Sequence, residues 1–426
     1  MEYKGRSGGA SAIFESSTDN AMELEQIDLA DLDLYVDGDP HAAWKLLRAK
    51  APVHWNQHRG RGFWSISRYH DALAVYRNTE DFSSENGIVA ILTDKQDEMA
   101  RALGFRQMLI FNDPPRHTRM RQLVNRRFTP RALAPLEGQI RSIAVEILDA
   151  IAPRGRCDFV LDVASRLPTA VICEMMGIPK DDRDLMFSLA NMSIGSQDPE
   201  YQIEGSGRKT GQRAQKEYFD YLTGLTQERR AHLGNDLVSA IMGEFDGQRL
   251  SPSEVVFNTF LFVVAGQETT RNAISGGMLA LLRNPDQCAR LKADRALMPT
   301  AVEEILRYVS PVTHIMRTAK REVEMHGHKI RAGDRVVIWN ASANRDEAAF
   351  PDPDRFVVAR TPNDHLAFGH GEHFCLGANL ARLEVKVMIE EVLKRLPDME
   401  LAGPVARLRS HFVAGIKHLP VSYTPA

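Results

Sequence analysis

One segment of the sequence predicts a helix long enough to cross an entire domain. Residues 251–254 read Ser-Pro-Ser-Glu, which places an N-cap serine, a proline at the first helical position and a glutamate at the third, the pattern of a capping box. The helical pattern then continues without a break to about Arg283, before Asn284 and Pro285. Because a helix of that length spans about 45 Å, the remaining elements must be arranged around it.

The middle of this helix has an unusual composition. Residues 265–270 read AGQETT, so a glycine, an acid and two threonines directly follow an apolar run. A glycine costs about 1 kcal/mol in a helix interior, which indicates a second role for this segment. The pattern alone leaves a plain structural interpretation open, because a threonine hydroxyl can hydrogen-bond the carbonyl one turn earlier while the acid lies on the surface.

A glycine-rich turn with one cysteine precedes a second helix. Residues 368–382 read FGHGEHFCLGANLAR, so three glycines flank Cys375, and the pattern then becomes helical through about Leu396. Glycines permit tight turns and close approach of the backbone to a flat ligand. At the start of a helix, free N–H groups and the helix dipole stabilise a thiolate, the kind of axial ligand that lets a heme iron cleave dioxygen. A buried, unreactive cysteine in a turn is the other interpretation.

The full pattern F-x-x-G-x-H-x-C-x-G resembles the heme-binding loop of bacterial cytochromes P-450. The resemblance covers nearly the whole chain, from about residue 25 to the end, and its motifs occur in the family order. It implies heme b as the cofactor, with Cys375 as the axial thiolate ligand of the iron and Gly377 in the binding loop. It also implies that Phe368 packs near the sulfur and that His373 lies beside a heme propionate.

The same resemblance implies the cytochrome P-450 fold, mainly α with small β-sheets and with the heme between the long central helix and the Cys-ligand loop and helix. Helical periodicity at 131–151 and 212–233 agrees with this expectation. The short β-rich segments that would form the sheets are 52–56, 62–67, 322–339 and 410–423. We expect a flexible N-terminal tail over residues 1–20 and a single catalytic domain over residues 21–426.

In this family, the AGQETT segment matches the pattern that faces the heme. Ala265 would then contact the cofactor, and the following glycine would open the helix. The resemblance implies that Thr269 and Glu268 are catalytic, because a hydroxyl and an acid placed there deliver protons to bound dioxygen. The expected reaction inserts one oxygen atom into an unactivated C–H bond or an alkene, and the second atom leaves as water.

Basic residues elsewhere match the family's propionate-binding positions. His117 and Arg121 lie four residues apart on one helix face, and Arg317 follows the segment 311–316. By themselves the first two are also consistent with a solvated basic helix. With His373 they would supply the partners that two buried carboxylates require.

A third group is expected to support the fold rather than the chemistry. Glu304 and Arg307 form an E-x-x-R pair on one face of a helix. In the family such a pair is buried and joined by a later arginine, for which Arg355 in the segment 350–356 is the expected residue. A bidentate arginine–carboxylate network suits a buried structural lock.

The expected substrate pocket is apolar, which predicts a hydrophobic substrate. Its expected lining, by analogy, includes the 186–205 region and Ile88, Leu92, Val264, Val312, Ile315, Phe412 and Val413. The segments 265–277 and 408–421 resemble the actinobacterial branch that oxidises sterols, terpenoids and fatty chains. Members of that branch also modify polyketides and other natural products, so the substrate class stays open among these.

Composition limits the partners. The net charge of -3 argues against nucleic acid as the main partner, and no apolar run approaches the roughly 18 residues of a membrane span. The cysteines other than Cys375 form no C-x-x-C pair, so we expect no structural zinc site. We expect a cytoplasmic monomer.

Electrons are expected to come from a separate ferredoxin and ferredoxin reductase, because the 51 residues after Cys375 are too few for a flavin reductase domain. One helix carries a cluster of basic residues, Arg116, Arg119, Arg126 and Arg127. This cluster either forms a docking face for the acidic partner or is simply a solvated helix face.

Two other functions stay open at this point. An enzyme of the same fold can use peroxide directly or catalyse a rearrangement, although such members often lack the acid–alcohol pair of Glu268 and Thr269. A non-enzymatic heme protein can sense gas or carry electrons, but an electron carrier needs no polar residues above the iron.

Overall fold

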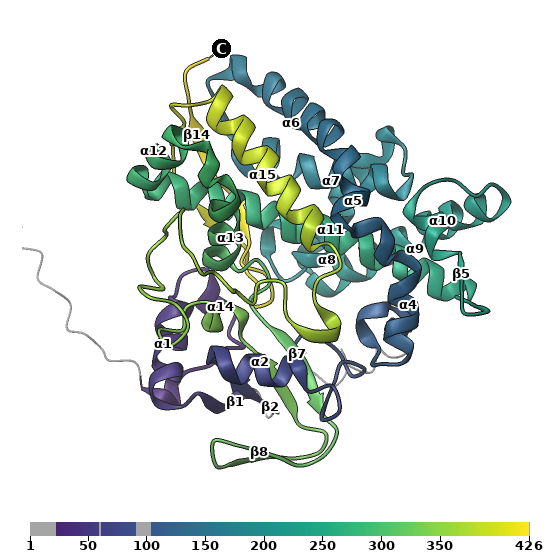
Figure 1. The fold of residues 1–426 in the computed structure, drawn as a ribbon, viewed down its shortest axis with the longest axis vertical. Helices are drawn as coiled ribbons and strands as arrows, with labels where there is room; N and C mark the ends of the chain where they lie inside the picture. The colour runs from purple at the N-terminus through teal and green to yellow at the C-terminus, as the bar shows by residue number, and fades with distance from the viewer. Residues whose placement is uncertain (1–22, 59–60, 91–103, 426) are drawn as a thin grey trace, which may run out of the picture.

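Helix α11 (Pro252–Arg283) runs through the middle of the computed structural model, which describes residues 23–58, 61–90 and 104–425 (Figure 1). Its start has the predicted capping box. Ser251 Oγ accepts the Glu254 N–H at 3.2 Å, and Glu254 Oε2 accepts the Ser251 N–H at 2.7 Å. The predicted end at Arg283 is confirmed as well.

Among the described helices, those that pack most extensively against α11 are α7 (Arg166–Met176), α9 (Gly207–Ala231), α13 (Met298–Val309) and α15 (Ala378–Arg395). Gly266 lets α7 come close, because an added Cβ would lie 2.9 Å from Ile172 Cγ1. The mid-helix glycine therefore has a packing role. The helix stays α-helical through residues 265–270, so the expected opening at this glycine is wrong for this structure.

The remaining helices cover the outside of this group, and Figure 1 shows α6 lying beside α15. They are α1 (Pro40–Lys50), α2 (Tyr69–Arg77), α4 (Arg116–Asn125), α5 (Pro130–Leu133), α6 (Glu137–Ile151), α8 (Arg183–Ile194), α10 (Leu237–Ile241), α12 (Pro285–Ala293) and α14 (Asn340–Ala343). The helical segment predicted at 131–151 is present as α5 and α6, with a 3-10 turn at Ala134–Leu136 between them. The segment predicted at 212–233 corresponds to α9.

The largest sheet has five strands in the order β1-β2-β10-β7-β3 and lies at one end of the helical body (Figure 1). Its strands are β1 (Val53–His58), β2 (Arg61–Ile66), β3 (Phe82–Ser83), β7 (Ile315–Ala319) and β10 (Arg335–Ile338). Among the described strands of this sheet, β2 and β10 pair in parallel, with Val336 opposite Trp64, and the other neighbours are antiparallel. This sheet confirms the β-rich segments predicted near residues 52, 62 and 335.

The described residues also form several smaller sheets. One has three strands in the order β11-β14-β4, and the others are two-stranded pairs. Their strands are β4 (Arg156–Asp158), β5 (Glu244–Phe245), β6 (Gln248–Arg249), β8 (Val323–Met325), β9 (His328–Ile330), β11 (Glu400–Leu401), β12 (Ala406–Arg407), β13 (Ile416–His418) and β14 (Pro420–Ser422). The prediction at 410–423 is correct only in its second half, because residues 410–415 form no strand.

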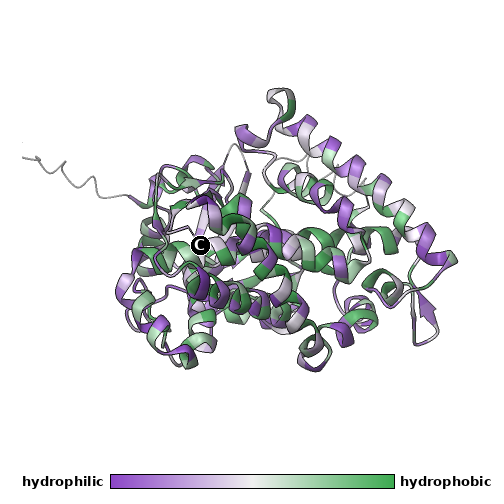
Figure 2. Ribbon diagram, turned by 90° about the horizontal axis from the view of Figure 1, so that it is seen from above, coloured by the Kyte–Doolittle hydropathy of each residue, from purple (hydrophilic) through white to green (hydrophobic). Residues whose placement is uncertain are grey.

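The main core is built from the helices around α11, and two smaller clusters lie between the sheet and helices α1 and α2. Figure 2 shows hydrophobic residues along the central helices and hydrophilic residues on the outward sides of the peripheral ones. Among the helices of the described residues, none has both the length and the apolarity needed to cross a bilayer. The predicted tail, residues 1–20, lies outside the described residues, and the single-domain assignment stays a prediction.

Candidate active site

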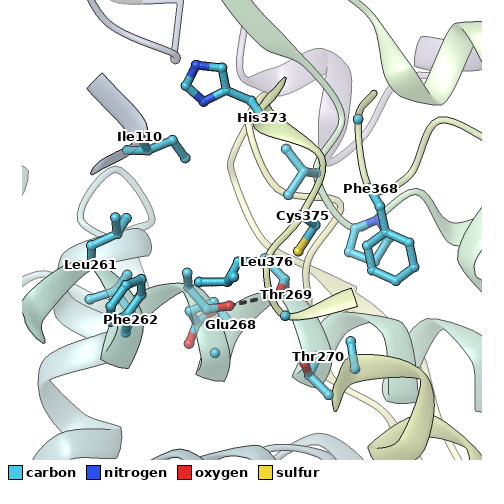
Figure 3. Close-up of a pocket in the computed structure, with 18 of the residues that line it drawn as sticks. Ile110, Leu261, Phe262, Glu268, Thr269, Thr270, Phe368, His373, Cys375 and Leu376 are labelled. Atoms are coloured by element: carbon cyan, nitrogen blue, oxygen red, sulfur yellow. Dashed lines mark hydrogen bonds between the residues drawn. The ribbon is translucent and has the colours of Figure 1, made fainter. Parts of the chain in front are cut away.

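A cavity of about 350 Å³ lies between α11 and the turn that carries Cys375 (Figure 3). Its wall is mostly apolar. It includes every predicted pocket residue that the structure describes, namely Ile88, Val264, Val312, Ile315, Phe412 and Val413. Leu92 lies outside the described residues. Of the 186–205 region, Ile194 reaches the cavity.

Cys375 is presented to this cavity by a turn folded against α2. Gly371 has a φ of +71°, and an added Cβ would lie 2.8 Å from the Tyr76 carbonyl oxygen, so only glycine fits there. The Cys375 N–H donates to the Phe368 carbonyl at 2.9 Å, which closes the turn. Phe368 also lines the cavity, and its packing near the sulfur stays a prediction. Figure 3 shows the sulfur directed into the cavity.

The turn does not ionise the sulfur by itself. Burial raises the pKa of the Cys375 thiol, while the Gly377 backbone N–H and the charges of Arg121 and Arg382 act in the opposite direction. The helix α15 begins only at Ala378, so its dipole contributes less than the sequence suggested. A metal cation is the group that deprotonates such a thiol outright.

Ala265 and Thr269 lie on the face of α11 that borders the cavity. Thr269 Oγ1 donates to the Ala265 carbonyl at 2.9 Å (Figure 3). The back-bonded conformation considered for this threonine is therefore present. Because the hydroxyl proton is engaged by that carbonyl, Oγ1 is left as a hydrogen-bond acceptor.

Glu268 is not a surface residue, because its side chain is 3% exposed. Its Oε2 lies 2.6 Å from Arg271 Nη2, three residues along the helix, and the Arg271 side chain is equally buried. Burial raises the pKa of Glu268, and the positive charge of Arg271 opposes that shift. Burial and the Arg271 charge therefore act on the proton affinity of this acid in opposite directions.

The four predicted propionate partners gather at one side of the cavity. The rings of His117 and His373 are 4.0 Å apart between centroids, and His373 Nε2 lies 3.2 Å from Ser84 Oγ. Arg317 is buried, and its guanidinium lies 5.8 Å from the centroid of the Tyr76 ring. These contacts bring together residues from α4, β7 and the cysteine turn.

The two arginines and two histidines of this group have no directly paired carboxylate among the described residues, although the more distant Asp113 and Glu372 act on them. Across residues 23–58, 61–90 and 104–425, none of His117, Arg121, Arg317 and His373 forms an ion pair with a carboxylate. Burial, followed by the nearby arginines, lowers the pKa of His117 to about 4. Burial, with Arg317 next, lowers the pKa of His373 to about 2.

A flat group with two carboxylates fits this site. Buried donors without acceptors are unfavourable, and His117 Nδ1 has no hydrogen-bond partner in the described part of the chain. Two propionates would satisfy these donors, and a metal at the centre of the group would face the Cys375 sulfur. The residues present therefore fit the heme that the sequence resemblance implies.

The structural lock is present, but one of its three members was predicted wrongly. Arg307 and Glu304 form a fully buried bidentate pair, with Nε–Oε2 and Nη2–Oε1 distances of 2.8 and 2.9 Å. The third arginine is Arg360, whose Nε lies 3.0 Å from Glu304 Oε2. Arg355 is 72% exposed and lies 3.7 Å from Asp352. It contributes its main-chain carbonyl, which accepts from Arg307 at 3.2 Å.

Other residues of the site were missed. Ile110, Leu261 and Phe262 line the cavity (Figure 3). Glu384 on α15 also lines it, is buried, and has a carboxyl oxygen without a partner among the described residues. Its position one turn after the buried Leu380 was a usable signal, because an acid on the apolar face of a helix is unusual.

Comparisons with known proteins agree with this geometry. The sequence profile of the family described as cytochrome P-450 matches residues 33–397. The chain is 40% identical over 418 residues to the methyl-branched lipid omega-hydroxylase of Mycobacterium tuberculosis, covering 95% of this chain and 96% of the relative. It is 38% identical over 413 residues to the steroid C26-monooxygenase of the same species, covering 95% and 98%.

A solved structure confirms the predicted fold class. The Mycobacterium marinum cytochrome P-450 in complex with pseudoionone superimposes with a TM-score of 0.88 at 36% identity. The match covers 95% of this chain and all of the other.

Proposed function

The chain belongs to the cytochrome P-450 family of monooxygenases, and from that premise we propose that it hydroxylates an unactivated C–H bond of a lipid- or steroid-like substrate. One observation carries the proposal: the Cys375 thiol and the Glu268–Thr269 pair border one apolar cavity. A metal-binding thiol, a proton-moving pair and an apolar binding space are the three parts that this reaction needs from the protein.

The residues of this chain have distinct tasks in that reaction. Heme, which we propose to be heme b, supplies the oxygen chemistry when bound. Cys375 would ligate its iron, Arg121 and Arg317 would neutralise its propionates, and His117 and His373 would hydrogen-bond them. Thr269 Oγ1 accepts a hydrogen bond from the cavity side because its own proton is held by the Ala265 carbonyl.

Proton transfer then falls to Glu268. The acid and the threonine are neighbours on α11, so a proton can pass from the buried carboxyl towards the cavity face. The presence of this pair favours oxygen activation over direct use of peroxide or a rearrangement. It also favours an enzyme over an electron carrier.

The apolar wall supports a lipid-like substrate. The described lining combines aliphatic residues with the rings of Phe260, Phe262 and Phe412. Burying such a surface against a hydrocarbon contributes about 25 cal/mol per Å². The names of the relatives point the same way, because they act on a methyl-branched lipid and on a steroid. Terpenoids and polyketide-type products are further candidates.

We propose that a ferredoxin and its reductase deliver the electrons and that the enzyme is a cytoplasmic monomer. Some of the arginines expected on the docking face already bind other residues of this chain. Arg116 forms an ion pair with Glu254 at 2.6 Å, and Arg127 donates to Asn235 at 2.7 Å. Arg126 is exposed, so reversing its charge is the sharper test: the first electron transfer should slow, and an unchanged rate would remove this face from the proposal.

The central test is spectroscopic. Purified enzyme should bind heme, and its reduced carbon-monoxide complex should show a thiolate signature. Cys375→Ala should abolish that signature, whereas Cys173→Ala, at another buried free cysteine, should retain it. Steroids, methyl-branched lipids, fatty acids, terpenoids and polyketides are then compared by the shift each causes in the heme spectrum. Oxidation by the Cys375→Ala variant would overturn the assignment.

A further inference from the structure

Several buried polar atoms without protein partners surround the proton-transferring acid. They are both amide atoms of Gln267, Oε2 of Glu268, Nε of Arg271 and the hydroxyl of Tyr201. None of them has a hydrogen-bond partner in the part of the chain that the structure describes. The side chains of Gln267, Glu268 and Arg271 are all almost fully buried, so bulk solvent does not reach these atoms directly.

Gln267, Glu268 and Arg271 lie close together on α11, and Glu268 also borders the cavity. Gln267 and Glu268 are four and three residues before Arg271, so all three side chains lie within one helical turn. The guanidinium reaches across to α8, where Nη1 donates to Asn191 Oδ1 at 2.6 Å. Although Arg271 Nη2 lies 2.6 Å from Glu268 Oε2, this contact lacks the direction of a hydrogen bond.

Tyr201 lies at the end of α8, the helix whose Asn191 binds Arg271. It lies in the 3-10 turn η10 (Pro199–Tyr201), and its ring packs on the end of α8. An added Cβ at Gly195 would lie 2.2 Å from the tyrosine Cδ2 and 2.8 Å from the Asn191 carbonyl oxygen. Glycine at this position therefore lets the ring reach its place. Burial raises the pKa of Tyr201 to about 12, and the charges of Arg271 and Glu268 also act on its hydroxyl.

The turn that carries Tyr201 is anchored from outside. Lys417 Nζ lies 3.0 Å from Asp198 Oδ1 and 2.9 Å from Glu200 Oε2, and His418 Nε2 lies 2.7 Å from Glu200 Oε1. The Glu200 side chain is partly exposed. Glu200, directly before Tyr201, thus belongs to a charged group that meets solvent.

We propose that Gln267, Arg271, Asn191 and Tyr201 enclose a water-holding chamber through which Glu268 regains protons from solvent. Buried polar groups in folded proteins are almost always hydrogen-bonded, and where protein partners are lacking a buried water makes about three such bonds. The unpartnered atoms here include donors and acceptors, as a bridging water requires.

The chamber gives each residue a separate task. Glu268 releases one proton towards Thr269 and regains one from chamber water, so protons balance and no electrons move. Arg271 cannot relay a proton, because a guanidinium does not deprotonate in proteins; it positions the carboxylate, and Asn191 positions Arg271. The inference rests on the proposed function, because only oxygen activation creates a repeated demand for protons at Thr269.

The first test looks for the chamber itself. A high-resolution crystal structure of the heme-loaded enzyme should show ordered water within hydrogen-bond distance of the Tyr201 hydroxyl and the Gln267 amide. The Gln267→Leu variant, which keeps the side chain's size without its polar atoms, should lose that water. A dry chamber in the parent enzyme would overturn the proposal, whether or not any substrate is ever turned over.

The second test measures proton supply with a steroid or methyl-branched lipid that shifts the heme spectrum. Tyr201→Phe should lower kcat roughly tenfold, a part of the 10²–10⁴-fold that general acid–base groups contribute, with KM unchanged. The solvent isotope effect on kcat should rise, and more of the consumed reductant should appear as hydrogen peroxide. Gln267→Leu should reproduce this pattern, which covers the case in which Tyr201→Phe folds poorly.

Tyr221→Phe is the matched control. Tyr221 lies on α9 and donates to Asp182 Oδ2 at 2.7 Å, away from Glu268. It should keep the parent kcat and isotope effect. If Tyr201→Phe and Gln267→Leu behave like this control, or if they change KM alone, the chamber is not the proton route. Absence of oxidation by the parent enzyme with every substrate class would instead count against the proposed function.

Discussion

Replacing Arg360 with methionine is expected to lower the free energy of unfolding by about 3–5 kcal/mol, the usual cost of removing one partner from a buried ion pair. The Arg360 side chain is only 8% exposed, and Nε lies 3.2 and 3.0 Å from the two Glu304 carboxylate oxygens. Its other nitrogens donate to main-chain carbonyls, including that of Pro351 at 2.6 Å. The same replacement at Arg355, which is exposed and 3.7 Å from its partner, should cost less than about 1 kcal/mol.

The two variants form a matched pair, because they make the same substitution in one loop. Both are prepared with heme, and unfolding by urea is followed by circular dichroism and by heme absorbance. Arg360→Lys should recover only part of the loss, because an ammonium cannot serve both carboxylate oxygens and the carbonyls at once. Equal stability of the Arg360 and Arg355 variants would refute the network described here.

Three further predictions follow from buried positions. Burial raises the pKa of Glu384 well above 4.5, so the unfolded chain binds fewer protons than the folded one and this group lowers the free energy of unfolding as pH rises. In urea unfolding, Glu384→Gln should therefore become more stable relative to the parent above about pH 5. A stability difference that is equal at all pH values would contradict this. Gly266→Val should lower the free energy of unfolding by about 1–3 kcal/mol, because the added side chain is overpacked against Ile172. Adding Ile172→Ala to this variant should recover part of the lost free energy. Ser251→Ala should cost about 1 kcal/mol through loss of the helix cap, measured in the same assay; no change would show that the cap is dispensable.

The sequence predicted correctly the features whose interacting residues lie close together along the chain. The capping box at Ser251 is such a signal, because its partners are three residues apart. The cysteine turn is another, since the turn itself gives Gly371 a φ of +71°, a conformation that favours glycine. The first half of the β-rich segment predicted at 410–423 failed for the opposite reason: a strand needs a partner along its length, and residues 410–415 have one isolated bridge among the described residues, Val413 with Val312.

Long-range contacts could not be predicted in this way. Arg355 and Arg360 lie in the same irregular loop, where no periodicity states which side chain points inward. The path of the backbone decides it, because the Arg355 carbonyl rather than its guanidinium meets Arg307. Asn191 and Arg271 are 80 residues apart and meet only because α8 crosses α11. Nothing in either segment alone indicates that contact.

Two buried acids, Glu268 and Glu384, line the cavity, and a neighbouring arginine distinguishes them. Glu268 and Glu384 lie on different helices, and burial raises the pKa of both. A relay must release and regain its proton, which requires a pKa near the working pH. Arg271 lies three residues after Glu268, on the same face, and opposes the shift. Arg382 lies two residues before Glu384, so it points elsewhere and pairs with Glu303 at 2.7 Å. Glu384 is left with burial alone, so Glu268 is the acid of this wall that has a buried cation beside it, and we assign proton transfer to Glu268.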